Sequence, residues 1–151
     1  MPTEYILAYH CAPAFAGIKP SNIASCSKRE NPNITVQIKM LNEKLNKNDI
    51  YIDVLCECGE RVLLMVYRKQ KLCEYLQRDD IKSFLCDNDY PKEFSLMKYL
   101  AILKSRIYAQ RLMNKEFPHE IGAFLGYPLH DIYGFINHKH QGCLLTGEWK
   151  V

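Results

Sequence analysis

The stretch that decides the fold class is DIYIDVLCECGERVLLMVYR, residues 49–68. It contains two runs rich in Val, Ile, Leu and Tyr, separated by a short polar segment with Gly59. β-branched and aromatic residues are typical of strands, and a glycine between two such runs is typical of a tight turn. The stretch therefore predicts a β-hairpin, so the protein contains a sheet.

Helical patterns lie on both sides of this hairpin. Apolar residues recur at helical spacing in four segments: 34–47, 69–77, 78–87 and 94–115. The last of these is the strongest, because Leu96, Leu100, Leu103 and Ile107 form one apolar stripe along it. We therefore expect a long helix in the second half of the chain.

A tight helical corner is predicted for EIGAFLGYPLHDIYGFI, residues 120–136. Pro118 opens the first helix of the corner, Gly126 ends it, and Pro128 starts the second helix. Proline disfavours helical geometry at the residue before it, so the chain must leave the first helix early. We expect Gly126 to adopt the left-handed conformation that makes this possible.

Short strands are predicted near both ends of the chain, at residues 4–11 (EYILAYHC) and 143–151 (CLLTGEWKV). Residues 12–33 contain several prolines and polar residues and are interpreted as irregular. The resulting order of elements predicts a single α+β domain over residues 1–151. Its small, mostly antiparallel sheet is expected to pack against the long helix and the helical corner.

The composition is that of an ordinary globular protein. The chain has 151 residues, of which 48% are hydrophobic and 25% charged, and its net charge is +3. No apolar run is long enough to span a membrane, and the N-terminus does not resemble a signal peptide. An odd number of cysteines, seven, argues against a closed disulfide framework. We therefore predict reduced thiols and a cytoplasmic location.

Three segments carry a resemblance to a known family: HCAPAFAGIKPSNI, FPHEIGAFLGYPLHDIYGFI and GEWKV. The chain resembles the bacterial domain-of-unknown-function family 3793 over almost its whole length. The resemblance implies one compact cytoplasmic domain and supplies no activity. Members of the family usually continue beyond Trp-Lys-Val, so the resemblance also implies that this chain lacks a C-terminal extension.

A reactive thiol is the first functional hypothesis. Cys11 precedes Ala-Pro, which is a favourable start for a helical turn, and a helix N-terminus stabilises a thiolate. A nucleophilic thiol also needs a base and an acidic group that orients the base, which His119 and Glu120 can supply. The predicted catalytic residues are Cys11, His119 and Glu120, and the predicted ligand contacts are His10, Lys19, Tyr127 and Asp131. The plainer interpretation is that Cys11 packs in the core.

A DNA-binding regulator is the second hypothesis, because the helical corner over residues 118–140 resembles a helix-turn-helix. The expected phosphate contacts are Lys104, Arg111 and Lys115 of the preceding long helix. The candidate reading helix has no arginine, and Asp131 in its first turn repels phosphates. DNA binding therefore ranks below a thiol-centred pocket, and a protein-interaction module ranks third.

Cysteine and histidine spacing does not predict a metal site. Cys56 and Cys58 are one fragment of a ligand set, and His138, His140 and Cys143 are another. A structural zinc ion normally needs four ligands at recognisable spacing, which neither fragment provides. No motif identifies a cofactor. The predicted partner is a small-molecule ligand, while its identity, the reaction and the oligomeric state are left open.

Overall fold

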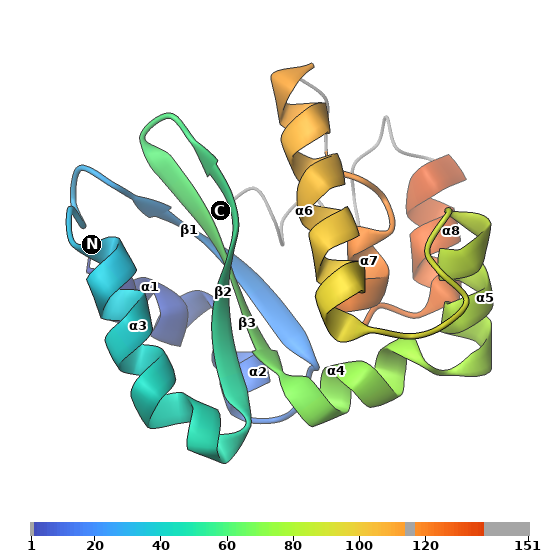
Figure 1. Cartoon of the computed structure of the whole chain (residues 1–151), viewed down its shortest axis with the longest axis horizontal. Coiled ribbons are helices and arrows are strands. Elements are labelled where there is room, and N and C mark those ends of the chain that lie inside the picture. Colours follow the sequence, from blue (N-terminus) through green and yellow to red (C-terminus); the bar gives the residue numbers. More distant parts are fainter. Residues whose placement is uncertain (1, 114–116, 138–151) are drawn as a thin grey trace. The chain divides into compact units, whose positions relative to one another are not determined.

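The computed structural model describes residues 2–113 and 117–137 (Figure 1). The chain divides into two compact units, a first unit of Met1–Leu72 and a second unit of Cys73–Lys150. The single-domain organisation stays a prediction. In the described ranges, every helix is too short or too polar to cross a membrane.

The strands of the described residues all belong to the first unit. β2 (Ile50–Cys58) and β3 (Arg61–Arg68) form the predicted hairpin, with Gly59 at a φ of 60° in the turn. β1 (Ser21–Ser27) pairs with the other edge of β3, which gives the order β1-β3-β2 with antiparallel neighbours. This small antiparallel sheet among helices confirms the α+β fold class.

The prediction of a strand over residues 4–11 is wrong, because this segment is helical. α1 (Thr3–His10) buries Thr3, Ile6 and Leu7, and because Ile6 and Leu7 follow Thr3 by three and four residues, the three lie on one helical face. The four-residue helix α2 (Ala12–Phe15) follows it. The third strand is β1 instead, in a segment that the prediction treated as irregular. The strand character of β1 comes from its pairing with β3, a tertiary interaction that overrides local preference.

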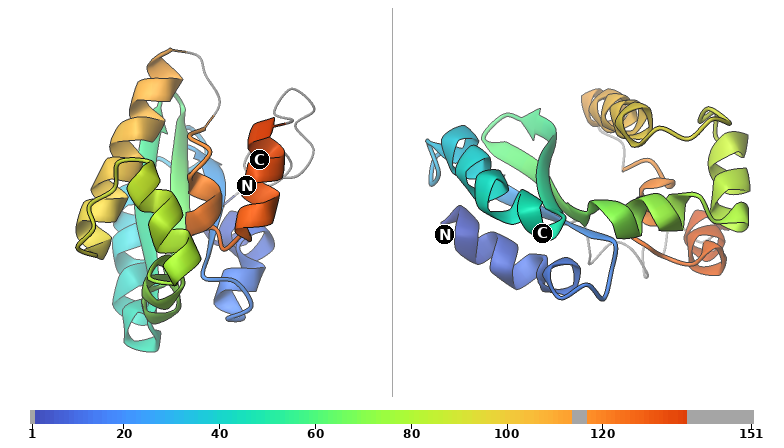
Figure 2. Two further views of the ribbon diagram at one scale, coloured as in Figure 1. Left: turned by 90° about the vertical axis from the view of Figure 1, so that its right-hand side faces the viewer. Right: turned by 60° about the horizontal axis from the view of Figure 1, so that its bottom comes forward.

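The core of the first unit lies between one face of the sheet and the helices α1 and α3 (Ile34–Leu45) (Figure 2). α1 runs beside β1, and α3 runs beside β2. A short 3-10 helix, η1 (Asn46–Asn48), links α3 to β2. The helix predicted over residues 34–47 is thus confirmed. Apolar side chains from these elements form one cluster that includes Leu7, Cys11, Ile38, Ile52, Leu64 and Val66.

The described part of the second unit is helical. α4 (Lys69–Leu76) contains the boundary between the units, and α5 (Asp79–Asp87) follows it. The long helix is α6 (Leu96–Leu112), which begins with a hydrogen bond from the Lys98 N–H to Ser95 Oγ at 3.4 Å. Tyr99, Leu100, Leu103 and Ile107 form its buried face. These helices confirm three of the predicted segments.

The helical corner consists of α7 (Ile121–Phe124) and α8 (Leu129–Asn137). Gly126 has a φ of 83°, which confirms its predicted left-handed conformation. The Tyr127 N–H donates to the Gly122 carbonyl at 2.9 Å, and the Gly126 N–H donates to the Ala123 carbonyl at 3.1 Å. This pair of bonds is a Schellman motif. The side chain of Phe135 and the strand predicted at residues 143–151 lie outside the described residues.

Candidate functional site

Cys11 lies at the junction of α1 and α2, where its side chain is buried with 0% exposure. Burial raises the pKa of the thiol to about 12, and the nearby Cys26 thiol adds to the increase. The charge of Lys19 lowers the pKa, but its effect is smaller than that of burial. Burial, the largest of these causes, favours the neutral thiol over the thiolate. The catalytic role of Cys11 stays a prediction.

His119 and Glu120 precede α7 in the second unit. His119 Nε2 lies 3.0 Å from Asn88 Oδ1, and the ring packs edge-on against Phe84. Glu120 is only 2% exposed and accepts hydrogen bonds from Tyr90 Oη at 3.2 Å and Arg106 Nη1 at 2.5 Å. Since Cys11 belongs to the first unit, its catalytic pairing with these two residues stays a prediction.

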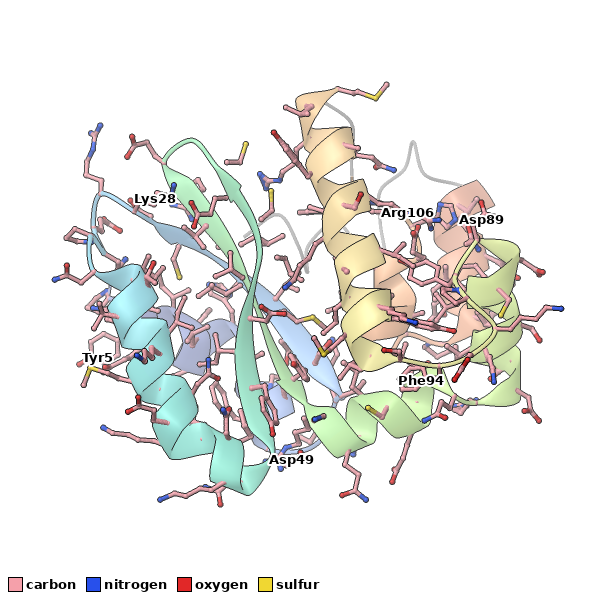
Figure 3. All side chains as sticks on the ribbon, in the orientation of Figure 1. Tyr5, Lys28, Asp49, Asp89, Phe94 and Arg106 are labelled. Atoms are coloured by element: carbon pink, nitrogen blue, oxygen red, sulfur yellow. The ribbon has the colours of Figure 1, made fainter. Side chains whose placement is uncertain are left out.

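The arrangement around Glu120 explains its burial. The guanidinium of Arg106 lies 4.8 Å from the centre of the Tyr90 ring, so the carboxylate, the phenol and the guanidinium form one cluster. Burial and the adjacent Glu120 carboxylate raise the pKa of Tyr90 well above its usual value. Arg106 and Asp89, which are labelled in Figure 3, border a shallow depression of about 380 Å³ that also contains His119. The cluster links α6 to the start of α7.

The predicted ligand contacts are divided between the two units. His10 ends α1 and packs edge-on against Tyr9 with ring centres 4.8 Å apart, and Lys19 is half-buried in the same unit. In the second unit, the Tyr127 carbonyl accepts a hydrogen bond from Tyr75 Oη at 2.8 Å, and Asp131 lies in the first turn of α8. The convergence of these four side chains on one ligand stays a prediction.

The predicted phosphate contacts are described in part. Lys104 is half-buried on α6, and the Arg111 guanidinium lies 5.5 Å from the centre of the Phe117 ring. Lys115 lies outside the described residues. Their role in DNA binding therefore stays a prediction. In the described ranges, no group of three or more His, Cys, Asp and Glu side chains is arranged to hold a metal ion.

Sequence reasoning missed how firmly α2 is attached to the sheet. The Ala14 N–H donates to Asn22 Oδ1 of β1 at 2.9 Å. Arg68 of β3 donates from Nε to the Ala14 carbonyl at 2.8 Å and from Nη2 to the Phe15 carbonyl at 2.5 Å. Gly17 has a φ of 77°, and a Cβ at this position would lie 3.4 Å from Arg68 Nε. Side chains from two strands thus satisfy backbone groups at both ends of this short helix.

The opposite helix, α3, is held to the sheet through Asn42. Its side chain accepts a hydrogen bond from the Ile52 N–H at 2.8 Å and donates one to the Ile52 carbonyl at 2.9 Å. Ile52 lies in β2, which is an edge strand with backbone groups that need partners. Asn42 therefore fixes the position of α3 relative to the sheet.

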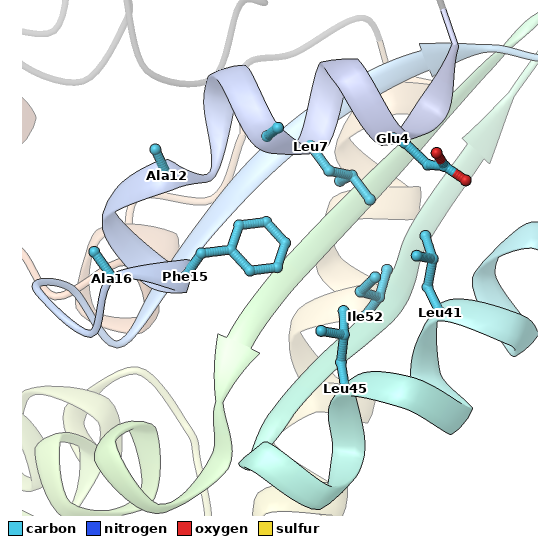
Figure 4. A pocket seen from close by; sticks show the side chains of 9 residues that line it. Glu4, Leu7, Ala12, Phe15, Ala16, Leu41, Leu45 and Ile52 are labelled. Carbon is cyan, nitrogen blue, oxygen red and sulfur yellow. The ribbon is translucent and has the colours of Figure 1, made fainter.

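An apolar groove of about 560 Å³ lies between these two attached helices within the first unit (Figure 4). Figure 4 shows Phe15, Leu45 and Ile52 pointing into the space that the helices share. The residues that line the groove are Glu4, Leu7, Ala8, Ala12, Phe15, Ala16, Leu41, Leu45 and Ile52. Among these described lining residues, Glu4 is the only charged one, and Cys11 is not one of them.

The groove exists because one of its walls carries small side chains. Ala8, Ala12 and Ala16 are spaced four residues apart and line it from the α1–α2 side, opposite Leu41 and Leu45 of α3. The spacing of these alanines is visible in the sequence and is typical of one helical face. The prediction of a strand over residues 4–11 concealed it.

The comparison with family models gives one match, to the family described as protein of unknown function (DUF3793), over residues 7–151. No curated protein and no solved structure shows significant similarity to the chain. The match begins within α1 and includes the α2 segment, the sheet and the helical corner. Because it covers nearly the whole sequence, this chain belongs to the family of proteins of unknown function DUF3793.

Proposed function

We propose that this protein binds an apolar small molecule in the groove between α1–α2 and α3. The observation that carries the proposal is the lining of the groove, in which eight of nine residues are apolar. A volume of about 560 Å³ falls within the range typical of small-molecule sites. Covering apolar surface with a ligand removes it from water, which lowers the free energy and so favours binding.

The attachment of both walls supports the proposal. Arg68 and Asn22 fix the backbone of α2, and Asn42 fixes α3 to β2. A site that is already formed before binding loses little conformational freedom when the ligand enters. The groove therefore resembles a largely preformed ligand site more than a surface that folds on binding.

The proposal retains part of the sequence-based hypothesis and changes its chemistry. The motif HCAPAFAG still contributes the ligand contacts, through Ala12, Phe15 and Ala16. Cys11 of the same motif packs behind the groove in the core, and its raised pKa favours the inert thiol at neutral pH. The proposed activity is thus binding in the cytoplasm without a covalent step.

Side chains that fill the groove test this function. Ala12→Ile and Ala16→Leu enlarge two exposed lining residues, so they reduce the volume that is open to a ligand with little strain in the core. We expect each variant to weaken binding of a naphthylamine dye, whose fluorescence rises in apolar surroundings, by about tenfold. Ala101→Leu, at an exposed alanine of α6 in the second unit, is the matched control.

Thermal unfolding of each variant checks that the fold is intact. The proposal requires wild-type affinity in Ala101→Leu and weaker binding in both groove variants at unchanged stability. Equal dye affinity in all four proteins would show that the dye binds elsewhere and would overturn the groove as the ligand site. Absence of dye binding to the wild-type protein would overturn the function itself.

A further inference from the structure

The geometry points to a ligand class for this groove: a single-chain amphiphile with a cationic head group, its alkyl tail along the groove and its head beside Glu4. The inference rests on the proposed function and goes beyond it by naming the chemistry at both ends of the ligand. It is carried by the order of the lining residues along α1 and α2 and by the position of the one charge among them.

Four lining residues of the α1–α2 wall follow one another at intervals of four. Glu4 is followed by Ala8, Ala12 and Ala16, and each of them lines the groove. In Figure 4, Glu4 lies at one end of this row and Ala16 at the other. The eight residues of α1 alone extend about 12 Å. A row of apolar lining residues of this length suits an extended alkyl chain.

The opposite wall and the base of the groove match an alkyl chain over the same length. Leu41 and Leu45 are one helical turn apart on α3, while Ile52 lines the groove from β2 and Leu7 from α1. Phe15 reaches into the groove from α2, near the end that is remote from Glu4. All of these lining side chains are aliphatic or aromatic, so they contact the uncharged tail of the ligand. The head group of the ligand then lies at the Glu4 end of the groove.

The charge at that end selects the head group. A carboxylate at the mouth of an apolar groove attracts an ammonium group and repels the carboxylate of a fatty acid. The chain as a whole carries a net charge of +3, so general electrostatic attraction would favour an anionic ligand. A preference for a cation would therefore report the local effect of Glu4. Because Glu4 is exposed, this preference is modest.

Displacement of the naphthylamine dye tests the inference with three probes that share one tail: dodecylammonium, dodecanol and dodecanoate, each below its micelle concentration at neutral pH. We expect dodecylammonium to compete about two- to fivefold better than dodecanol, and dodecanoate to compete least well. Glu4→Gln should remove the difference between the ammonium and the alcohol, and Glu4→Lys should make dodecanoate the best of the three. Glu43→Gln, at an exposed acid of α3 that does not line the groove, should leave the wild-type order unchanged.

The outcomes separate the inference from the proposed function. If the dye binds and the three probes compete equally, or if Glu4→Gln leaves the preference intact, the head-group assignment is overturned and apolar binding stands. If dodecanoate displaces the dye from the wild-type protein best, a fatty acid replaces the cation as the ligand class. If neither the dye nor any probe binds, the proposed function fails and the inference fails with it.

Discussion

Two short helices, one in each unit, have almost the same local structure and different surroundings. α2 belongs to CAPAFAG, residues 11–17, and α7 to EIGAFLG, residues 120–126. Both helices have four residues and end in a left-handed glycine, with φ of 77° at Gly17 and 83° at Gly126. In both, the N–H after the glycine donates to a carbonyl five residues earlier, at 2.8 and 2.9 Å. The two segments therefore use the same Schellman cap.

The side chains of the two helices differ in size and burial. All four residues of α7 are buried, whereas Ala14 is the only buried one among the four described residues of α2. α7 begins at Ile121 and is followed by Leu125, whereas α2 has alanines, Ala12 and Ala16, at the corresponding positions. The same backbone thus becomes a core element when it carries large apolar residues and one wall of a groove when it carries alanines. Local structure and burial are decided separately.

The two helices should differ most in the stability lost when the phenylalanine at the same position of each is replaced. Phe124 is 0% exposed and Phe15 is half-buried. We expect Phe124→Ala to lower the free energy of unfolding by about 3–5 kcal/mol, and Phe15→Ala to lower it by about 1 kcal/mol. Urea unfolding followed by circular dichroism measures both values. Equal losses would mean that α2 is as much a core element as α7.

The residues that precede the two helices give the next comparison. Cys11 needs no charged partner, whereas the buried Glu120 depends on Arg106 and Tyr90. Arg106→Met should lower the free energy of unfolding by about 3 kcal/mol, because it leaves a buried carboxylate without its cation. The double variant with Glu120→Gln should recover part of this loss, since the amide is neutral. No recovery would show that Arg106 contributes by packing and not by charge.

Replacing the glycine of either cap should lower the stability of the protein. Gly126→Val forces a β-branched residue into left-handed geometry and should lower the free energy of unfolding by about 1–3 kcal/mol. Gly17→Val carries the same strain, and a Cβ there would lie at ordinary contact distance from Arg68, 3.4 Å from Nε, so its loss should be similar. Urea unfolding of the two variants side by side measures the difference. A neutral result at either glycine would contradict the shared cap.

The last comparison concerns Cys11, where the expected effect on the fold is smallest. The quantity to be measured is the rate at which its thiol reacts. Burial raises the pKa of its thiol from an ordinary 9.0 to about 12, which lowers the thiolate fraction at neutral pH about a thousandfold. Cys11 should therefore react with iodoacetamide far more slowly than the exposed Cys58. The stability that depends on the neutral thiol is present below pH 9.0 and is lost as pH rises toward about 12. Faster labelling of Cys11 in peptide mass spectrometry would restore the thiol-centred hypothesis.

Local patterns in the sequence were sufficient to predict most of the helices and strands. The hairpin over residues 49–68, the helices α3 to α6 and the left-handed Gly126 depend on periodicity and turn residues within short windows. Such patterns act through neighbours along the chain, so they can be read without knowing the rest of the fold. The apolar stripe of α6 was predicted in this way, with Tyr99 in place of Leu96 on its buried face.

The tertiary structure alone decided the features that form the groove. β1 is a strand because it pairs with β3, and α2 is fixed because Arg68, more than fifty residues away in sequence, donates to its carbonyls. The raised pKa of Cys11 likewise depends on core residues from other elements. A short segment does not encode partners that the chain brings together only when it folds. The sequence by itself therefore determined the hairpin, the helices α3 to α6 and one cap. The strand β1, the burial of the thiol and the position of the groove follow from contacts between distant residues.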